Sequence, residues 1–186
     1  MTNKIKYGLK NVTVWPIETE IDGVTTYATT PIKVPGAVNL SISAEGSNDP
    51  FYADDIIYFS AFANNGYSGD LEIALVPEEF ETGILGYTKD KNGAIIEKID
   101  AKAKNFAMAF EFKGDVNATR HLLYKVAVSR PDLASHTKED KIAPVTDKLQ
   151  ITATANAEGN IKTKLTKGQE GYDTFLSTVY KEVTEE

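Results

Sequence analysis

The chain has 186 residues, 41% of them hydrophobic, which is enough for a single domain with its own core over residues 1–186. It contains no cysteine, and this excludes a disulfide framework, thiolate catalysis and cysteine-ligated metal sites. Its 27 acidic and 20 basic side chains give a formal net charge of -7, and Arg120 and Arg130 are its only arginines, so a protein that grips nucleic acid is not expected.

The first 15 residues contain no apolar stretch and no small-residue cleavage pattern, so no secretion signal is predicted there. The longest mostly apolar segment, residues 56–63, is far shorter than the ~20 residues needed to span a bilayer. We therefore expect a protein that is made in the cytoplasm and has no membrane partner.

Alternation of apolar and polar residues is the main signal along the chain, and it predicts β-strands with two different faces. In chain order, the expected strands include residues 38–44, 51–62, 106–112, 121–129, 149–155 and 161–165. Turn-forming pairs such as Asp22-Gly23, Asn65-Gly66 and Asn92-Gly93 separate strands of this kind. Strands joined by such turns predict a mainly β fold, an antiparallel sandwich or barrel.

The segment FYADDIIYF (residues 51–59) sets two adjacent aspartates inside an apolar strand pattern. In a strand, successive side chains point to opposite faces, so the carboxylates of Asp54 and Asp55 are expected to diverge. Two diverging carboxylates share neither a proton nor a metal ion unless a bulge intervenes. A structural role is therefore predicted for both residues.

Two segments show helical spacing instead. Residues 77–86 begin with a proline suited to a first turn, continue with two acids that favour a helix N-terminus, and end at Gly86. Residues 172–183 place apolar and aromatic side chains three or four positions apart. We expect one flanking helix in the first segment, and in the second a short C-terminal helix that packs on the sheet or on a neighbouring subunit.

No part of the sequence predicts a catalytic centre, and we expect no enzyme activity, no cofactor and no metal. Ser68 lies in NNGYSGD, which lacks the G-x-S-x-G spacing of a serine nucleophile turn. His121 and His136 share no metal-ligand motif, and no dinucleotide-binding or P-loop glycine motif is present. A carbohydrate-binding sandwich uses exposed aromatic side chains, so Trp15 and the nine tyrosines leave open a monomeric carbohydrate-binding or adhesion module.

An ordered set of motifs adds a family resemblance. KYGLKNV, PGAVNLSISAEG, FYADDIIYF, NNGYSGDLEIALVPEEF, FAMAFEFKGD, NATRHLLYKVAVSRP and YDTFLSTVY follow one another over residues 6–180. In this order they resemble the major tail proteins, or tail tube proteins, of long-tailed phages and prophages of Gram-positive bacteria. The resemblance implies a virion structural protein, assembled in the host cytoplasm, whose hexameric rings stack into a hollow tube for DNA ejection. It also implies contacts with the tape measure, tail terminator and distal tail proteins, and no enzyme activity.

The resemblance further implies that strands of each subunit join into an inner barrel around the DNA, which passes without specific binding. The matching strands are residues 38–44, 51–62, 106–112 and 121–129. Five acids in or beside these strands are the candidates for lumen-facing or inter-subunit side chains: Glu45, Asp49, Asp54, Asp55 and Glu111. Alternation lets only one of Asp54 and Asp55 face the lumen, and Asp54 is expected there because its face is more polar. The loop of residues 43–50 would reach the next ring; the alternative is that the acids lie at ordinary subunit contacts.

Overall fold

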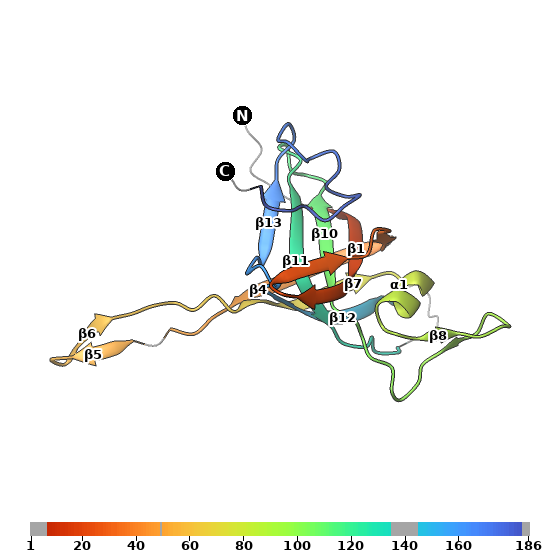
Figure 1. Cartoon of the computed structure of the whole chain (residues 1–186), viewed down its shortest axis with the longest axis horizontal. Helices are drawn as coiled ribbons and strands as arrows, with labels where there is room; N and C mark the ends of the chain where they lie inside the picture. The colour runs from red at the N-terminus through yellow and green to blue at the C-terminus, as the bar shows by residue number, and fades with distance from the viewer. Residues whose placement is uncertain (1–6, 49, 135–144, 184–186) are drawn as a thin grey trace, which may run out of the picture.

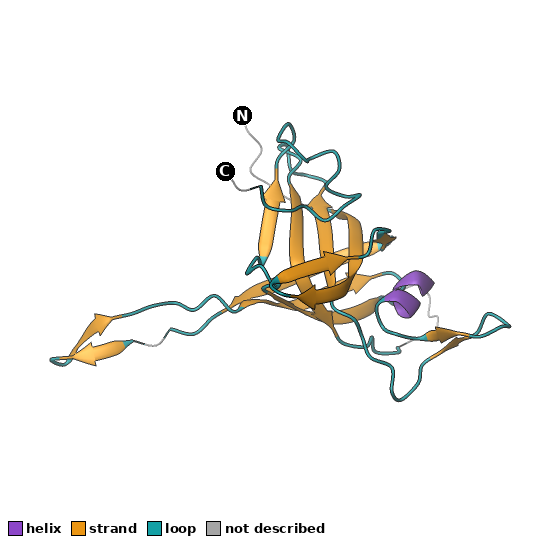
Figure 2. Ribbon diagram, in the orientation of Figure 1, coloured by secondary structure: helices purple, strands orange, loops and turns teal. Residues whose placement is uncertain are grey.

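The computed structural model describes residues 7–48, 50–134 and 145–183 (Figure 1). Its elements in chain order are β1 (Leu9–Ile21), β2 (Val24–Tyr27), β3 (Ile32–Lys33), β4 (Ala37–Glu45), β5 (Phe51–Ala53), β6 (Ile56–Phe59), β7 (Gly66–Ile73), α1 (Glu78–Gly83), β8 (Thr88–Lys89), β9 (Ile95–Ile96), β10 (Phe106–Phe112), β11 (Arg120–Val128), β12 (Asp147–Thr154) and β13 (Lys162–Leu165). Strands dominate, as Figure 2 shows, and the predicted mainly β fold is confirmed.

One large antiparallel sheet organises the chain, with the strand order β2-β1-β10-β11-β12-β7-β4. β11 belongs to two halves of this sheet, because residues 120–123 pair with β13 and residues 125–128 pair with β12. β3 pairs with β1, and β1 also contacts β4 at the far end of the strand order. The sheet therefore curls back on itself as an open barrel, in agreement with the predicted sandwich or barrel class.

The core lies on both sides of β10. Phe106, Met108 and Phe110 enter one apolar cluster, while Ala107 and Ala109 enter a second cluster, as alternation in a strand requires. The first cluster contains side chains of β7, β12 and α1, and the second contains Trp15 and Phe175. Both faces of β10 are thus covered within one chain, which leaves this strand no exposed face.

The predicted flanking helix is confirmed as α1, which is shorter than expected. It follows Pro77 and carries Glu78, Glu79 and Glu81 in its first turn, where carboxylates favour the positive end of the helix dipole. Its Phe80 side chain is fully buried and meets the Phe106 ring edge to face, with 5.7 Å between the ring centroids. This contact fixes the helix on the sheet.

The predicted C-terminal helix is wrong, because the described part of residues 172–183 forms turns and no helix. The Tyr172 carbonyl accepts a hydrogen bond from the Phe175 N–H at 3.2 Å and another from the Arg120 guanidinium. Gly171 just before it has φ +80, outside the helical region. The apolar stripe still packs on the sheet, since Tyr172 and Phe175 are buried in the second cluster.

The prediction of one strand over residues 51–59 is also wrong. β5 ends at Ala53, β6 begins at Ile56, and the two strands pair antiparallel as a hairpin. Asp54 and Asp55 form its two-residue turn with φ 51 and 59, the left-handed conformation that aspartate tolerates better than most residues. Both carboxylates therefore lie at the hairpin tip, and strand alternation does not separate them.

Candidate assembly surfaces

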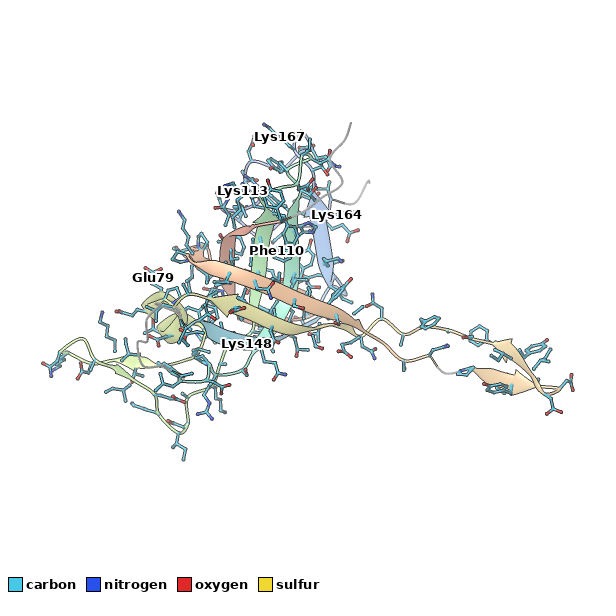
Figure 3. All side chains as sticks on the ribbon, turned by 180° about the vertical axis from the view of Figure 1, so that it is seen from behind. Glu79, Phe110, Lys113, Lys148, Lys164 and Lys167 are labelled. Carbon is cyan, nitrogen blue, oxygen red and sulfur yellow. The ribbon has the colours of Figure 1, made fainter. Side chains whose placement is uncertain are left out.

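A long arm, residues 46–64, leaves the body between β4 and β7 and ends in the β5–β6 hairpin (Figures 1 and 3). Its two sides are tied near the body by the Ala63 N–H, which donates to the Ser47 carbonyl at 2.9 Å, and by an isolated bridge between Asn48 and Phe62. The Ser60 hydroxyl adds a hydrogen bond to Asn48 Oδ1 at 2.6 Å. These contacts give the arm an extended, ladder-like course.

The arm exposes large apolar side chains on a scale found nowhere else in the described part of the chain. Seven side chains along it are exposed: Phe51, Tyr52, Ile56, Ile57, Tyr58, Phe59 and Phe62. The exposed fractions of Tyr58 and Phe62 reach 74% and 81%. An isolated two-stranded hairpin is at best marginally stable in water, and contiguous exposed apolar side chains mark interaction sites.

Glycines shape the base of the arm. A Cβ at Gly46 would lie 2.2 Å from the Ala63 carbonyl oxygen, so only glycine allows the two sides of the arm to come this close. Gly66, where β7 begins, has φ +102, and a Cβ there would lie 2.0 Å from the Ala153 carbonyl oxygen. Any side chain at these positions would force the arm to leave the body in another direction.

A second surface is the outer face of β4, β7 and β12, which is covered by polar side chains. Three registered rows cross it: Asn39–Glu72–Lys148, Ser41–Asp70–Gln150 and Ser43–Ser68–Thr152. The alternate residues of the same strands, such as Leu71 and Leu149, point into the core. The face is therefore polar because the opposite face of each strand is needed for packing.

Carboxylates outnumber ammonium groups on this polar face. Asp70 pairs with Lys148 (labelled in Figure 3) at 3.2 Å, while Glu72 accepts a hydrogen bond from the Thr146 hydroxyl. At the end of β4, Glu45 accepts a hydrogen bond from the Ser68 hydroxyl. One lysine thus faces three carboxylates over these strands, and a surface of this kind offers phosphate groups few cations to bind.

The five candidate acids occupy three different environments. Glu45 borders the polar face, and Asp54 and Asp55 lie together at the arm tip. Asp49 lies outside the described residues. Glu111 is buried in the body, so the structure brings it together with none of the others.

Glu111 is 5% exposed and holds an ionic network inside the subunit. Its carboxylate lies 3.2 Å from Lys10 Nζ and 3.3 Å from Arg120 Nε, and it accepts a hydrogen bond from the Asn11 amide. Burial alone raises the pKa of Glu111, but the hydrogen bonds from Asn11 and Lys10 and the charge of Lys10 outweigh it, so the pKa is lowered. Glu111 is therefore a charged structural group whose charge is balanced by Lys10 and Arg120 of the same chain.

Arg120 extends this network to the C-terminal segment. Its guanidinium lies over the Tyr172 ring, 4.0 Å from the centroid, and also donates a hydrogen bond to the Tyr172 carbonyl. The Tyr172 hydroxyl donates to the Ala118 carbonyl at 2.7 Å. These bonds take the place of the helical hydrogen bonds that the sequence pattern predicted.

The residues considered for chemistry are dispersed. Ser68 lies on the polar face, and the His121 ring stacks on Phe110 with 5.3 Å between centroids. His136 lies outside the described residues. Over residues 7–48, 50–134 and 145–183, no group of three or more His, Asp or Glu side chains is placed to hold a metal ion. In the same ranges, no helix has the length and apolar character to cross a bilayer.

Trp15 is 1% exposed, so it has no face available for stacking on a sugar ring. It lies in the second apolar cluster, where its indole N–H finds no hydrogen-bond partner among the residues that the structure describes. The exposed aromatic side chains of the chain are instead concentrated on the arm. Among the described residues, the arm is thus the place where a sugar-binding function would have to reside.

Sequence reasoning missed both surfaces in part. The polar face has a readable signal, since residues 68, 70 and 72 and residues 148, 150 and 152 are all polar at every second position. The arm has a weaker signal, because its aspartate pair interrupts an apolar run that otherwise has the pattern of one strand.

Comparison of the chain with models of protein families and with curated proteins finds no match.

Proposed function

We propose that this protein is a structural subunit of a phage tail tube, assembling into stacked hexameric rings that form the conduit for DNA ejection. The observation that carries the proposal is the arm, whose exposed apolar side chains find no partner surface within the described chain. Burying a large apolar side chain contributes about 1.5–3 kcal/mol, so seven of them favour association strongly. The family resemblance supplies the kind of assembly.

The polar face of β4, β7 and β12 is the proposed DNA-facing wall. Of the strands expected there from the sequence it keeps β4; β10 is covered on both faces, and β5 and β6 lie on the arm. The side chains of the polar face are uncharged or acidic with the exception of Lys148. Such a wall gives DNA no row of cations to neutralise its phosphates, so the duplex slides without specific binding. In this proposal the subunit carries no enzyme activity, and its partners are copies of itself and the tape measure, tail terminator and distal tail proteins.

Removal of the arm tests the proposal. Glu45 pairs with Gly66, so an Asn-Gly turn in place of residues 46–65 closes β4 and β7 as a two-residue hairpin. The full chain is expected to form rings or tubes at high concentration by negative-stain electron microscopy. The shortened chain is expected to stay monomeric in sedimentation velocity and to keep a cooperative thermal transition.

A full chain that stays monomeric at every concentration, or a shortened chain that still forms rings or tubes, would contradict the proposal. Loss of cooperative unfolding in the shortened chain would show that the arm stabilises the body and would invalidate the comparison. A glycan array with the full chain and with the shortened chain distinguishes the proposal from the carbohydrate-binding alternative. That alternative requires the full chain to bind a sugar and the shortened chain to lose this binding.

A further inference from the structure

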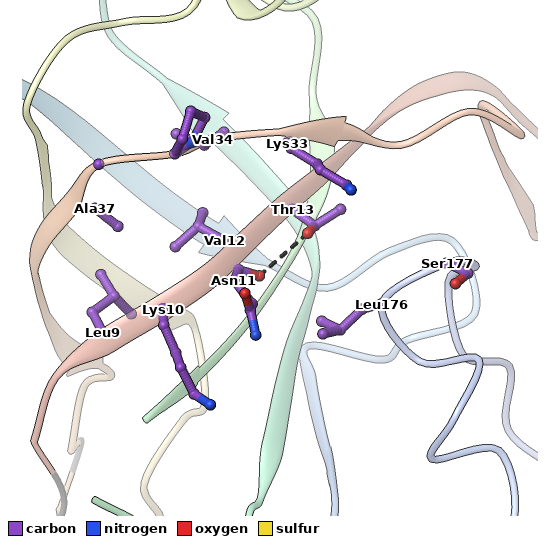
Figure 4. A pocket seen from close by; sticks show the side chains of 12 residues that line it. Leu9, Lys10, Asn11, Val12, Thr13, Lys33, Val34, Ala37, Leu176 and Ser177 are labelled. Atoms are coloured by element: carbon purple, nitrogen blue, oxygen red, sulfur yellow. Dashed lines mark hydrogen bonds between the residues drawn. The ribbon is translucent and has the colours of Figure 1, made fainter. Parts of the chain in front are cut away.

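A groove is lined by residues of β1, by residues 33–37 from β3 to the start of β4, and by Leu176 and Ser177 (Figure 4). It has a volume of about 580 Å³, within the ~300–1,000 Å³ range of pockets that bind a drug-sized group. Leu9, Val12, Ala37 and Leu176 give it apolar walls, and Lys10 and Lys33 stand at its rim. Asn11, Thr13 and Ser177 add polar groups to the lining, so the groove combines a partly apolar interior with a cationic edge, and this combination fits a segment that carries both apolar and acidic groups.

The charge of the groove is unbalanced. Among the described residues, no carboxylate lines the groove. Lys10 reaches Glu111 at 3.2 Å, whereas Lys33 is exposed and forms no ion pair in the described part of the chain. A partner that brings a carboxylate to Lys33 would gain a charge-assisted contact.

The tip of the arm has this chemistry. Asp54 and Asp55 lie side by side at the turn and are exposed, and Tyr52, Ile56 and Ile57 flank them as exposed apolar side chains. The whole arm, residues 46–64, contains no lysine and no arginine. Its tip therefore complements the groove both in charge and in apolar character.

The arm and the groove lie at opposite ends of β4. The groove borders Ala37, where β4 begins, and the arm leaves after Glu45, where β4 ends. At a rise of ~3.3 Å per residue, β4 spans about 27 Å, and the arm adds up to about 30 Å in the same direction (Figure 1). A chain cannot place its own tip in its own groove without folding the arm back, so the occupant comes from another copy.

We propose that the groove formed by β1, β3 and the start of β4 receives the arm tip of a second copy of the chain, with Asp54 and Asp55 approaching Lys33 and Lys10. This inference rests on the proposed self-assembly and names the surface that the arm binds. Because the two surfaces are different and lie at opposite ends, the contact is head-to-tail and repeats from copy to copy.

Charge reversal and its rescue test the contact. Lys33→Glu alone, or Asp54→Lys with Asp55→Lys, is expected to raise the concentration needed for assembly about tenfold or more, the effect of losing ~1.4 kcal/mol at the contact. Combining the three changes restores opposite charges and is expected to recover most of the loss. Lys167→Glu is the charge-matched control, since Lys167 is exposed and lies outside the groove.

Disulfide trapping gives the second readout, and the absence of native cysteine makes it free of background. A chain with Lys33→Cys is mixed with a chain with Asp54→Cys under mild oxidation, and the covalent dimer is quantified on a non-reducing gel. We expect a strong cross-link for this pair and a weak one when Lys167→Cys replaces Lys33→Cys. Circular dichroism of each variant confirms that the body remains folded.

The outcomes separate the two proposals. Rings or tubes that form without a Lys33–Asp54 cross-link and without charge-swap rescue would overturn the groove assignment and leave the proposed function standing. A chain that stays monomeric and gives no cross-link at any concentration would overturn both. Equal trapping at Lys33 and Lys167 would also overturn the groove assignment, because it would show random collision.

Discussion

In the body of the chain, Phe80 and Phe106 are fully buried and meet edge to face, whereas in the arm Tyr58 and Phe62 are 74% and 81% exposed. The two regions contain similar aromatic and β-branched residues, but only the body surrounds them with other side chains. The free energy of burying such residues is gained during folding in the body and is still available to association in the arm. The same residue types thus serve folding in one region and, in the proposed assembly, docking in the other.

The largest expected difference between the two regions is in unfolding free energy. Phe106→Ala removes a buried ring from the first cluster and is expected to lower the free energy of unfolding by about 3–5 kcal/mol. Phe62→Ala is expected to change that of the monomer by less than about 0.5 kcal/mol, because the ring is exposed. Urea denaturation of both variants at low protein concentration measures the two values.

In an assembly assay, the order of the two effects is expected to reverse. Phe62→Ala is expected to raise the concentration needed for assembly, while the fraction of Phe106→Ala that remains folded still assembles. If both substitutions destabilised the monomer equally, the arm would have to pack on its own body in solution. The two regions would then no longer differ in how they use their apolar side chains.

A smaller effect is expected at Glu111, where the body holds its buried ionic network. Glu111→Gln keeps the shape but leaves Arg120 and Lys10 without a carboxylate, so a loss of about 3 kcal/mol is expected at pH 7. Lys125 and Glu20 form an exposed pair at 2.6 Å, and the control Glu20→Gln is expected to cost no more than about 1 kcal/mol.

The pH dependence of Glu111 has a definite sign. Its pKa is lower in the folded chain than the ordinary value, so the native state favours the charged carboxylate. The stabilisation is complete above the ordinary glutamate pKa of ~4.3 and is lost as the pH falls through the folded-state pKa. Urea titrations at falling pH should show a smaller acid-dependent loss in Glu111→Gln than in the native sequence; equal losses would mean that other carboxylates dominate.

The smallest expected effect separates shape from charge at the arm tip. Asp54→Asn with Asp55→Gly gives the Asn-Gly pair that two-residue hairpin turns prefer, and it removes both carboxylates. The turn is expected to gain about 0.5–1 kcal/mol, seen as slower amide exchange in β5 and β6. Assembly is nevertheless expected to weaken about tenfold, because Lys33 loses its counter-charge. Stronger assembly of this variant would show that turn rigidity matters more than charge.

Local pattern predicted the parts of the fold in which local chemistry and packing agree. The alternation in residues 106–112 gave β10, and the Pro77 and glutamate pattern gave α1, because each segment packs as its own periodicity requires. The C-terminal segment shows the limit. Its helical stripe is real, but Arg120, some 50 residues away in sequence, takes the Tyr172 carbonyl and stabilises turns instead.

The candidate surfaces were less predictable for a similar reason. Alternation shows that a strand has two faces, but which polar face remains exposed depends on which strands become neighbours, as the rows across β4, β7 and β12 illustrate. Glu111 reads as an ordinary polar position at the end of an apolar strand until Asn11 and Lys10 are placed beside it. The hairpin at Asp54 and Asp55 was missed because the residues on both sides of the turn are equally apolar.

The placement of arm and groove at opposite ends of β4 has a consequence for growth. A stack joined through these two surfaces is polar: one terminus presents free arms, and the other presents vacant grooves. Addition at the two termini then involves different collisions, so elongation rates differ between them. A factor that starts the stack and a factor that stops it must recognise unlike surfaces, and one protein could not do both by the same contact.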